Sequence, residues 1–146
     1  MKRLVLLACT AVFATAAMAQ DAPKPATASR AKAPAAVELY FIAPVEGATL
    51  GREIIVRFGL KGMGVAPAGV VKENTGHHHL LIDTDLPPLD QPIPNDEHHK
   101  HFGGGQTETA LTLTPGDHTL QLLLGDAAHL SFDPPVVSKK ITVHVK

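Results

Sequence analysis

Short runs of alternating apolar and polar residues, each ended by glycine or proline, are the feature that most limits how this chain can fold. The run 53–60 alternates from Ile54 to Phe58, and the run 106–113 alternates in the same way. Successive side chains of a β-strand point to opposite faces, so a period of two indicates strands with one buried face. The chain carries 12 Gly and 12 Pro, and no segment keeps the period of an amphipathic helix. We therefore predict an all-β fold.

The number of these runs favours one kind of all-β fold. Six segments read as strands: 37–42, 53–60, 77–83, 106–113, 117–124 and 136–145. Six or seven short strands joined by polar turns are typical of a sandwich, so we predict an immunoglobulin-like β-sandwich of about seven strands. Pro115-Gly116 lies between two of the runs, and we expect 106–113 and 117–124 to form a hairpin around it.

Residues 1–19 have the pattern of a secretory signal peptide. Lys2 and Arg3 precede an apolar run, 4–17, and Ala17-Met18-Ala19 offers the cleavage pattern of two small residues around a third. The run is too short and too rich in alanine to span a membrane. We expect cleavage before Gln20, export through the general pathway, a periplasmic location and no transmembrane segment in the mature chain.

The next segment, 20–36, has the composition of a linker. It contains seven Ala and three Pro with a few charged residues, and it shows no apolar periodicity. Such sequences form extended, mobile tethers rather than packed elements. We therefore divide the chain into a signal peptide (1–19), a flexible linker (20–36) and a β-sandwich domain (37–146).

Composition excludes one class of partner and points to one class of ligand. Thirteen basic residues against 14 acidic ones give a net charge of −1, which leaves no basic excess to bind a nucleic acid. The chain has nine His and one Cys, and Cys9 falls within the predicted signal peptide. The mature chain would then offer imidazole nitrogen, but no thiolate, to a transition metal.

The histidines are grouped at spacings that suit metal binding. His77 and His79 form one H-x-H pair on a predicted strand, and His99 and His101 form a second. Side chains two apart on a strand share a face, with Cα atoms roughly 6.5 Å apart, so two imidazoles can converge on one ion. His129 follows in a later loop. We predict that His77, His79, His99, His101 and His129 are metal ligands, and imidazole-rich sites favour copper or zinc.

Two other functions remain open at this point. His77-x-His79 followed by Asp83, with His118 downstream, is similar to the metal motifs of cupin barrels, which would imply an iron or manganese enzyme. The chain could instead be an immunoglobulin-like interaction module whose histidine-rich end binds another envelope protein. The run 103–105 of three glycines would let the backbone approach a ligand beside His101.

Four blocks of sequence resemble a known family. The blocks 76–83, 99–108, 118–126 and 133–136 occur in the order found in the family called domain of unknown function (DUF) 4399, a group of small exported bacterial proteins. The resemblance covers about residues 60–146. It implies that the H-x-H pairs and the glycine run belong to a family pattern, and it implies no activity.

Overall fold

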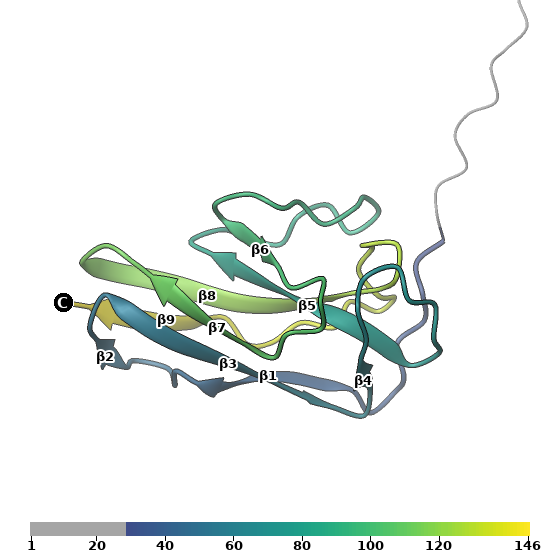
Figure 1. Cartoon of the computed structure of the whole chain (residues 1–146), viewed down its shortest axis with the longest axis horizontal. Helices are drawn as coiled ribbons and strands as arrows, with labels where there is room; N and C mark the ends of the chain where they lie inside the picture. Colours follow the sequence, from purple (N-terminus) through teal and green to yellow (C-terminus); the bar gives the residue numbers. More distant parts are fainter. Residues whose placement is uncertain (1–28) are drawn as a thin grey trace, which may run out of the picture.

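The computed structural model describes residues 29–146, and these form two β-sheets that pack face to face (Figure 1). Residues 29–146 contain no helix, so the all-β prediction is confirmed. The predicted signal peptide and residues 20–28 of the predicted linker lie outside the described residues. The immunoglobulin-like character of the sandwich stays a prediction.

The smaller sheet has three strands in the antiparallel order β1-β3-β7. These strands are β1 (Glu38–Ala43), β3 (Glu53–Lys61) and β7 (Glu108–Thr112). Along β3, buried Ile54, Val56 and Phe58 alternate with exposed Ile55 and Arg57, as the period of two predicts. The buried face of this sheet therefore points toward the second sheet.

The larger sheet has the order β2-β9-β8-β5-β4, and β6 pairs with β5 beside this path. Its strands are β2 (Thr49–Leu50), β4 (Gly64–Val65), β5 (Thr75–Ile82), β6 (His99–His101), β8 (Gly116–Gly125) and β9 (Ile141–Val145). The six predicted runs each overlap one of the six longer strands, and β2, β4 and β6 are additional strands of two or three residues.

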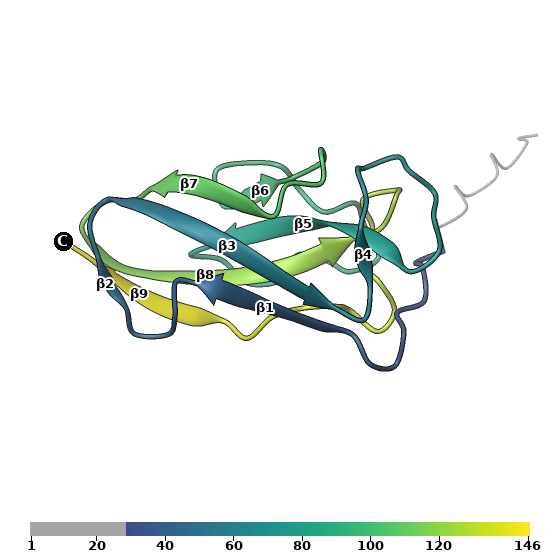
Figure 2. The ribbon, with the colours of Figure 1, turned by 60° about the horizontal axis from the view of Figure 1, so that its bottom comes forward.

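The predicted hairpin of 106–113 with 117–124 is wrong. β7 pairs with β3, where Glu53 lies opposite Thr112, whereas β8 lies between β5 and β9 (Figure 2). The turn at Pro115 therefore carries the chain from one sheet to the other instead of folding it back within one sheet. Alternation shows which face of a strand is buried, but it does not identify the partner strand.

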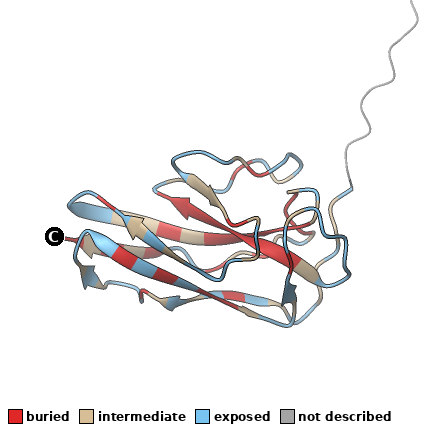
Figure 3. Cartoon of the chain, in the orientation of Figure 1, coloured by how far each residue is buried: buried red, intermediate tan, exposed pale blue. Residues whose placement is uncertain are grey.

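The main core lies between the sheets and contains fully buried side chains from both, among them Val56, Leu80, Leu122 and Val143. Full burial of one such side chain contributes roughly 1.5–3 kcal/mol to the stability of the fold. β5 is buried along almost its whole length (Figure 3). A second, smaller cluster explains this, because it covers the other face of β5 and β8; it consists of Leu81, Ile93, Leu123 and partly buried Val137.

The described end of the predicted linker lies against the domain. The Nε of Arg30 donates to the carbonyl of Ser131 over 3.0 Å, and the guanidinium also donates to the carbonyl of Phe132. Lys32 forms an ion pair with Asp133, whose side chain is partly exposed. Residues 30–33 are therefore fastened to the segment 131–133, which follows the loop that carries His129.

Candidate metal centre

β5 directs the first H-x-H pair to the outer face of the larger sheet. His77 and His79 alternate with His78, which points into the main core, where its ring centroid lies 5.1 Å from that of Phe58. Burial lowers the pKa of His78 to about 4, so this imidazole is neutral at pH 7. The prediction that His77 and His79 share a face is confirmed.

Four of the predicted ligands lie together on this outer face. The ring centroid of His77 lies 4.8 Å from that of His79, 5.0 Å from that of His101 and 4.9 Å from that of His129. The rings of His101 and His129 are 4.6 Å apart, and their Nε2 atoms are separated by 3.1 Å. We call these four side chains, His77, His79, His101 and His129, the imidazole cluster.

Three members of the cluster meet the geometric requirement for a shared ion. One ring nitrogen each of His77, His101 and His129 can be chosen so that all three lie within 4.8 Å of one another. His79 lies beside this group, with its ring stacked on that of His101 at a centroid separation of 5.0 Å. These imidazoles are placed to hold a metal ion.

Strand pairing brings His101 to the cluster. β6 runs antiparallel to β5 and places His101 directly opposite His79, so the two side chains share a face. Gly103 follows two residues later, and a Cβ added there would lie 2.4 Å from Cε1 of His101. Gly103 therefore lets the chain pass close against the imidazole of His101, and the approach of the backbone to a ligand stays a prediction.

A second glycine makes room for the pair on β5. Gly125 lies opposite His77 on β8, and a Cβ at this position would lie 2.7 Å from Cε1 of His79 and 3.2 Å from Nε2 of His77. Any larger residue would have to displace both rings. Sequence analysis missed this role, although a glycine at the end of a leucine-rich strand is a known sign of close approach by another group.

A tight loop presents His129 to the cluster. The Oδ1 of Asp126 accepts hydrogen bonds from the backbone N–H groups of Ala128 and Leu130, at 2.9 and 3.0 Å. His129 itself donates its backbone N–H to the carbonyl of Asp126 and has a φ of +64°, which is uncommon for a residue other than glycine. Asp126 therefore fixes the loop that carries His129.

The deep members of the cluster are neutral and have no protein partner. His77 and His79 are 1% and 0% exposed, and neither ring nitrogen of either residue has a hydrogen bond within the described part of the chain. Burial, followed by the nearby imidazoles of His129 and His101, lowers the pKa of His77 to about 4. Burial and the same kind of neighbours lower the pKa of His79 to about 2. Both rings are therefore neutral at pH 7, the form that donates a lone pair to a metal.

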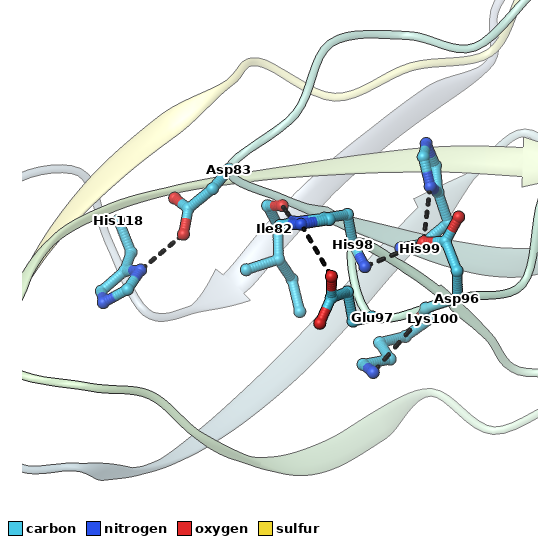
Figure 4. A network of polar contacts seen from close by, with 8 residues as sticks. All are labelled: Ile82, Asp83, Asp96, Glu97, His98, His99, Lys100 and His118. Carbon is cyan, nitrogen blue, oxygen red and sulfur yellow. Dashed lines mark hydrogen bonds and ion pairs between the residues drawn. The ribbon is translucent and has the colours of Figure 1, made fainter.

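His99, the fifth predicted ligand, lies outside the cluster. It is opposite Leu81 on β5, two residues before His101, and its Nδ1 lies 2.9 Å from the Oδ1 of Asp96 (Figure 4). His98 has its Nδ1 2.9 Å from the carbonyl oxygen of Ile82 and its Nε2 3.5 Å from a carboxylate oxygen of Glu97 (Figure 4). The second H-x-H pair therefore contributes one member to the cluster and leaves the other beside it.

Two residues of the cupin-like motif, Asp83 and His118, do not join His77 and His79 in the cluster. The Nδ1 of His118 lies 2.6 Å from the Oδ2 of Asp83 (Figure 4). Its Nε2 lies 2.9 Å from the carbonyl oxygen of Thr114. Hydrogen bonding to Asp83 raises the pKa of His118. Asp83 lies four residues beyond His79 on the β5 side, about 13 Å along an extended chain. These two residues satisfy each other rather than a shared ion.

Comparison with known proteins gives a family and nothing more specific. The family model described as a domain of unknown function (DUF4399) matches residues 56–146. Comparison with curated proteins found no match, and comparison with solved structures found none either. Within residues 29–146, no helix has the length and apolar character needed to cross a membrane.

Proposed function

The chain belongs to the DUF4399 family, whose name carries no activity, and we propose that it is an exported protein that binds copper(II) or zinc(II) through the imidazole cluster. The observation that carries the proposal is the convergence of His77, His79, His101 and His129 around buried ring nitrogens that have no protein partner. The N-terminal sequence supports export, and the mature chain would then meet these metals in the periplasm.

The cost of the cluster in the metal-free protein supports this proposal. A buried polar group without a hydrogen bond destabilises a fold by about 1–3 kcal/mol. His77 and His79 each bury two ring nitrogens in this condition, side by side. A bound ion would accept the one lone pair of each ring and would offset part of that cost, because metal binding to the folded state is also a contribution to folding.

The ligand type and spacing favour copper(II) or zinc(II). Nitrogen ligands without thiolate suit these two ions, and metal–nitrogen bonds to zinc are about 2.0–2.1 Å long. Two ligands at that bond length lie roughly 3.3 Å apart in a tetrahedral site and roughly 2.9 Å apart as neighbours in a square-planar site. The 3.1 Å between the Nε2 atoms of His101 and His129 lies between these values, so the spacing suits both ions.

Titration of the metal-free mature protein tests the binding. We expect calorimetry and native mass spectrometry to show one copper(II) or zinc(II) ion per chain with submicromolar affinity. His77→Ala should weaken binding at least about 100-fold, since it removes a ligand, and loss of even an outer partner of a ligand costs about 10–100-fold. His144→Ala is the matched control, because His144 lies on β9 with its Nδ1 2.6 Å from Asp117.

Two results would overturn the binding proposal: no uptake of either ion at micromolar concentration, or a His77→Ala variant that binds as the wild type does. Export has a separate test. Fractionation of Gram-negative cells that express the full chain should recover a form beginning at Gln20 in the periplasmic fraction, and recovery of uncleaved protein in the cytoplasm would contradict it.

A further inference from the structure

The imidazole cluster is reached from solvent through its outer members. His77 and His79 are buried to 1% and 0% exposure, whereas His101 and His129 are partly exposed. An ion that arrives from solvent therefore meets His101 and His129 before it reaches the ligands on β5. On the way, the ion must exchange its bound waters for imidazoles. A ligand just outside the cluster would let it replace these waters one at a time.

His99 lies at this position. It shares a face of β6 with His101, because the two are two positions apart on a strand, with Cα atoms roughly 6.5 Å apart. Its strand partner is Leu81, which lies on the same outer face of β5 as His79. His99 therefore lies next to His101 on the outer face of the larger sheet, and its side chain is 12% exposed.

One ring nitrogen of His99 is held by a carboxylate. Its Nδ1 lies 2.9 Å from the Oδ1 of Asp96 (Figure 4), so Nδ1 is the donor, and in the neutral ring the lone pair is on Nε2. No hydrogen bond reaches this Nε2 from any of residues 29–146, and it is not one of the fully buried nitrogen atoms. A metal-binding histidine usually donates the N–H of its other ring nitrogen to a carboxylate in this way.

The charge around His99 also favours a cation. The carboxylates of Asp96 and Glu97 are 51% and 86% exposed, and together they place negative charge at the start of β6. Lys100 lies between His99 and His101 but points to the opposite face of β6, and its ammonium group lies 3.3 Å from the carbonyl oxygen of Asp96. Exposed charge of one sign raises the local concentration of the opposite ion.

We propose that His99, oriented by Asp96, is a loading ligand that binds the arriving ion first and passes it to His101 and the rest of the imidazole cluster. This inference rests on the proposed function. His99 is absent from the final ligand set, so it should change the rate at which the ion enters and leaves without changing how tightly it is held. By microscopic reversibility, a ligand of this kind speeds loading and release by the same factor.

Stopped-flow measurement with a chromophoric zinc chelator tests the inference on the mature chain. His99→Ala should slow both zinc(II) uptake and zinc(II) release about tenfold, with an equilibrium affinity within about twofold of wild type. His98→Ala is the matched control, because it removes the neighbouring exposed imidazole on the other face, and its rates should equal those of wild type. Circular dichroism confirms that each variant is folded.

Asp96→Asn distinguishes two roles of Asp96: orienting the imidazole of His99 and holding the backbone of the loop. Asparagine keeps a side-chain oxygen that can accept the backbone N–H groups of His98 and His99, as Asp96 does at 2.9 Å, but it removes the charge behind the imidazole. Nitrogen-15 NMR of the metal-free protein should show His99 protonated at Nδ1 in wild type and a mixture of tautomers in Asp96→Asn. Loading by this variant should be slowed in the same direction as by His99→Ala.

Three outcomes overturn the inference and are distinct from one another. Wild-type loading rates in His99→Ala would show that the ion enters without it. A loss of affinity equal to the loss in loading rate would make His99 a member of the final ligand set. A wild-type protein that binds no zinc(II) or copper(II) at all would defeat the proposed function, and with it this inference.

Discussion

His79 and His118 lie on the neighbouring strands β5 and β8, and their imidazoles are surrounded in opposite ways. His79 is fully buried, has no hydrogen bond to either ring nitrogen, and its pKa is lowered by burial. Both ring nitrogens of His118 have partners, Asp83 and the carbonyl of Thr114, and its pKa is raised by the carboxylate.

The number of protein partners on the two ring nitrogens therefore distinguishes a histidine that stabilises the fold from one that is available to a ligand. An imidazole whose two nitrogens are both occupied by protein groups contributes to the fold and has nothing left for a ligand. A group of buried imidazoles without partners destabilises the fold unless something outside the protein binds them. The three predictions that follow change one side of this contrast at a time.

The largest effect is expected from Gly125→Ala. The new Cβ would lie 2.7 Å from Cε1 of His79 and 3.2 Å from Nε2 of His77, so both rings must move. We expect metal affinity to fall at least about 100-fold, and overpacking to cost about 1–3 kcal/mol in the free energy of unfolding. Calorimetric titration and urea unfolding measure the two effects.

Gly51→Ala is the matched control for this substitution. A Cβ added at Gly51 would have open space for 4 Å around it, and the φ of this residue is not in the left-handed region. The control should therefore bind metal as wild type does, with a change in stability below about 0.5 kcal/mol. Wild-type affinity in Gly125→Ala would show that the imidazole cluster is not where the ion binds.

An intermediate effect, of opposite sign in the metal-free protein, is expected from His79→Leu. Leucine is apolar and close to histidine in size, so it removes two buried nitrogens that lack partners and should stabilise the metal-free protein by about 1–2 kcal/mol. The same variant should lose most of the stabilisation that wild type gains from zinc(II) or copper(II). Urea unfolding with and without the ion measures both changes.

His144→Leu is the control here, since the imidazole of His144 is partly exposed and paired with Asp117. Its effect on metal-dependent stability should be negligible. If His79→Leu instead destabilises the metal-free protein by more than about 1 kcal/mol, the imidazole of His79 contributes to packing in its own right and the contrast with His118 fails.

The smallest effect concerns the paired side of the contrast and depends on pH. The folded-state pKa of His118 is raised above its ordinary value near 6.5, so the Asp83–His118 pair stabilises the fold fully below pH 6.5. That contribution is lost as the pH rises through the raised pKa. His118→Gln should therefore destabilise the protein by about 0.5–1 kcal/mol at pH 5.5 and by less at pH 9.

A double-mutant cycle with Asp83→Asn isolates this pair. Asp83 has a φ of +53°, a conformation that asparagine also tolerates, so the neutral variant keeps the backbone. The coupling energy between positions 83 and 118 should decrease from pH 5.5 to pH 9 in urea unfolding. A coupling energy that is the same at both values would show that the pair does not depend on the charge of His118.

Much of the fold follows from local pattern, while strand pairing does not. The alternation from Ile54 to Phe58 predicts both the strand and its buried face, and the H-x-H spacing predicts that His77 and His79 share a face. The pairing of Glu53 with Thr112 joins positions far apart in the chain, and no local signal encodes it. The hairpin prediction was wrong for that reason.

The candidate site could be predicted in part for a related reason. Spacing identifies imidazoles that share a face, and it correctly groups His99 with His101, but it does not say how far each lies from β5. Register decides that His101 lies opposite His79 and that His99 lies opposite Leu81. The position of His129 in the cluster depends on a loop that Asp126 closes and on a left-handed backbone conformation at His129. The sequence alone specifies neither.

The contacts of Arg30 and Lys32 with the segment 131–133 have a practical consequence for how this protein is labelled or immobilised. These contacts hold the start of the described chain against residues 131–133, which follow His129 closely in the sequence. The C-terminal strand β9, in contrast, ends beside Gly116, at the opposite end of β8. The cluster lies at the Gly125 end, roughly 30 Å away along the strand. A polyhistidine tag near residue 30 would add foreign imidazoles beside the imidazole cluster, while one after Lys146 would leave the cluster undisturbed.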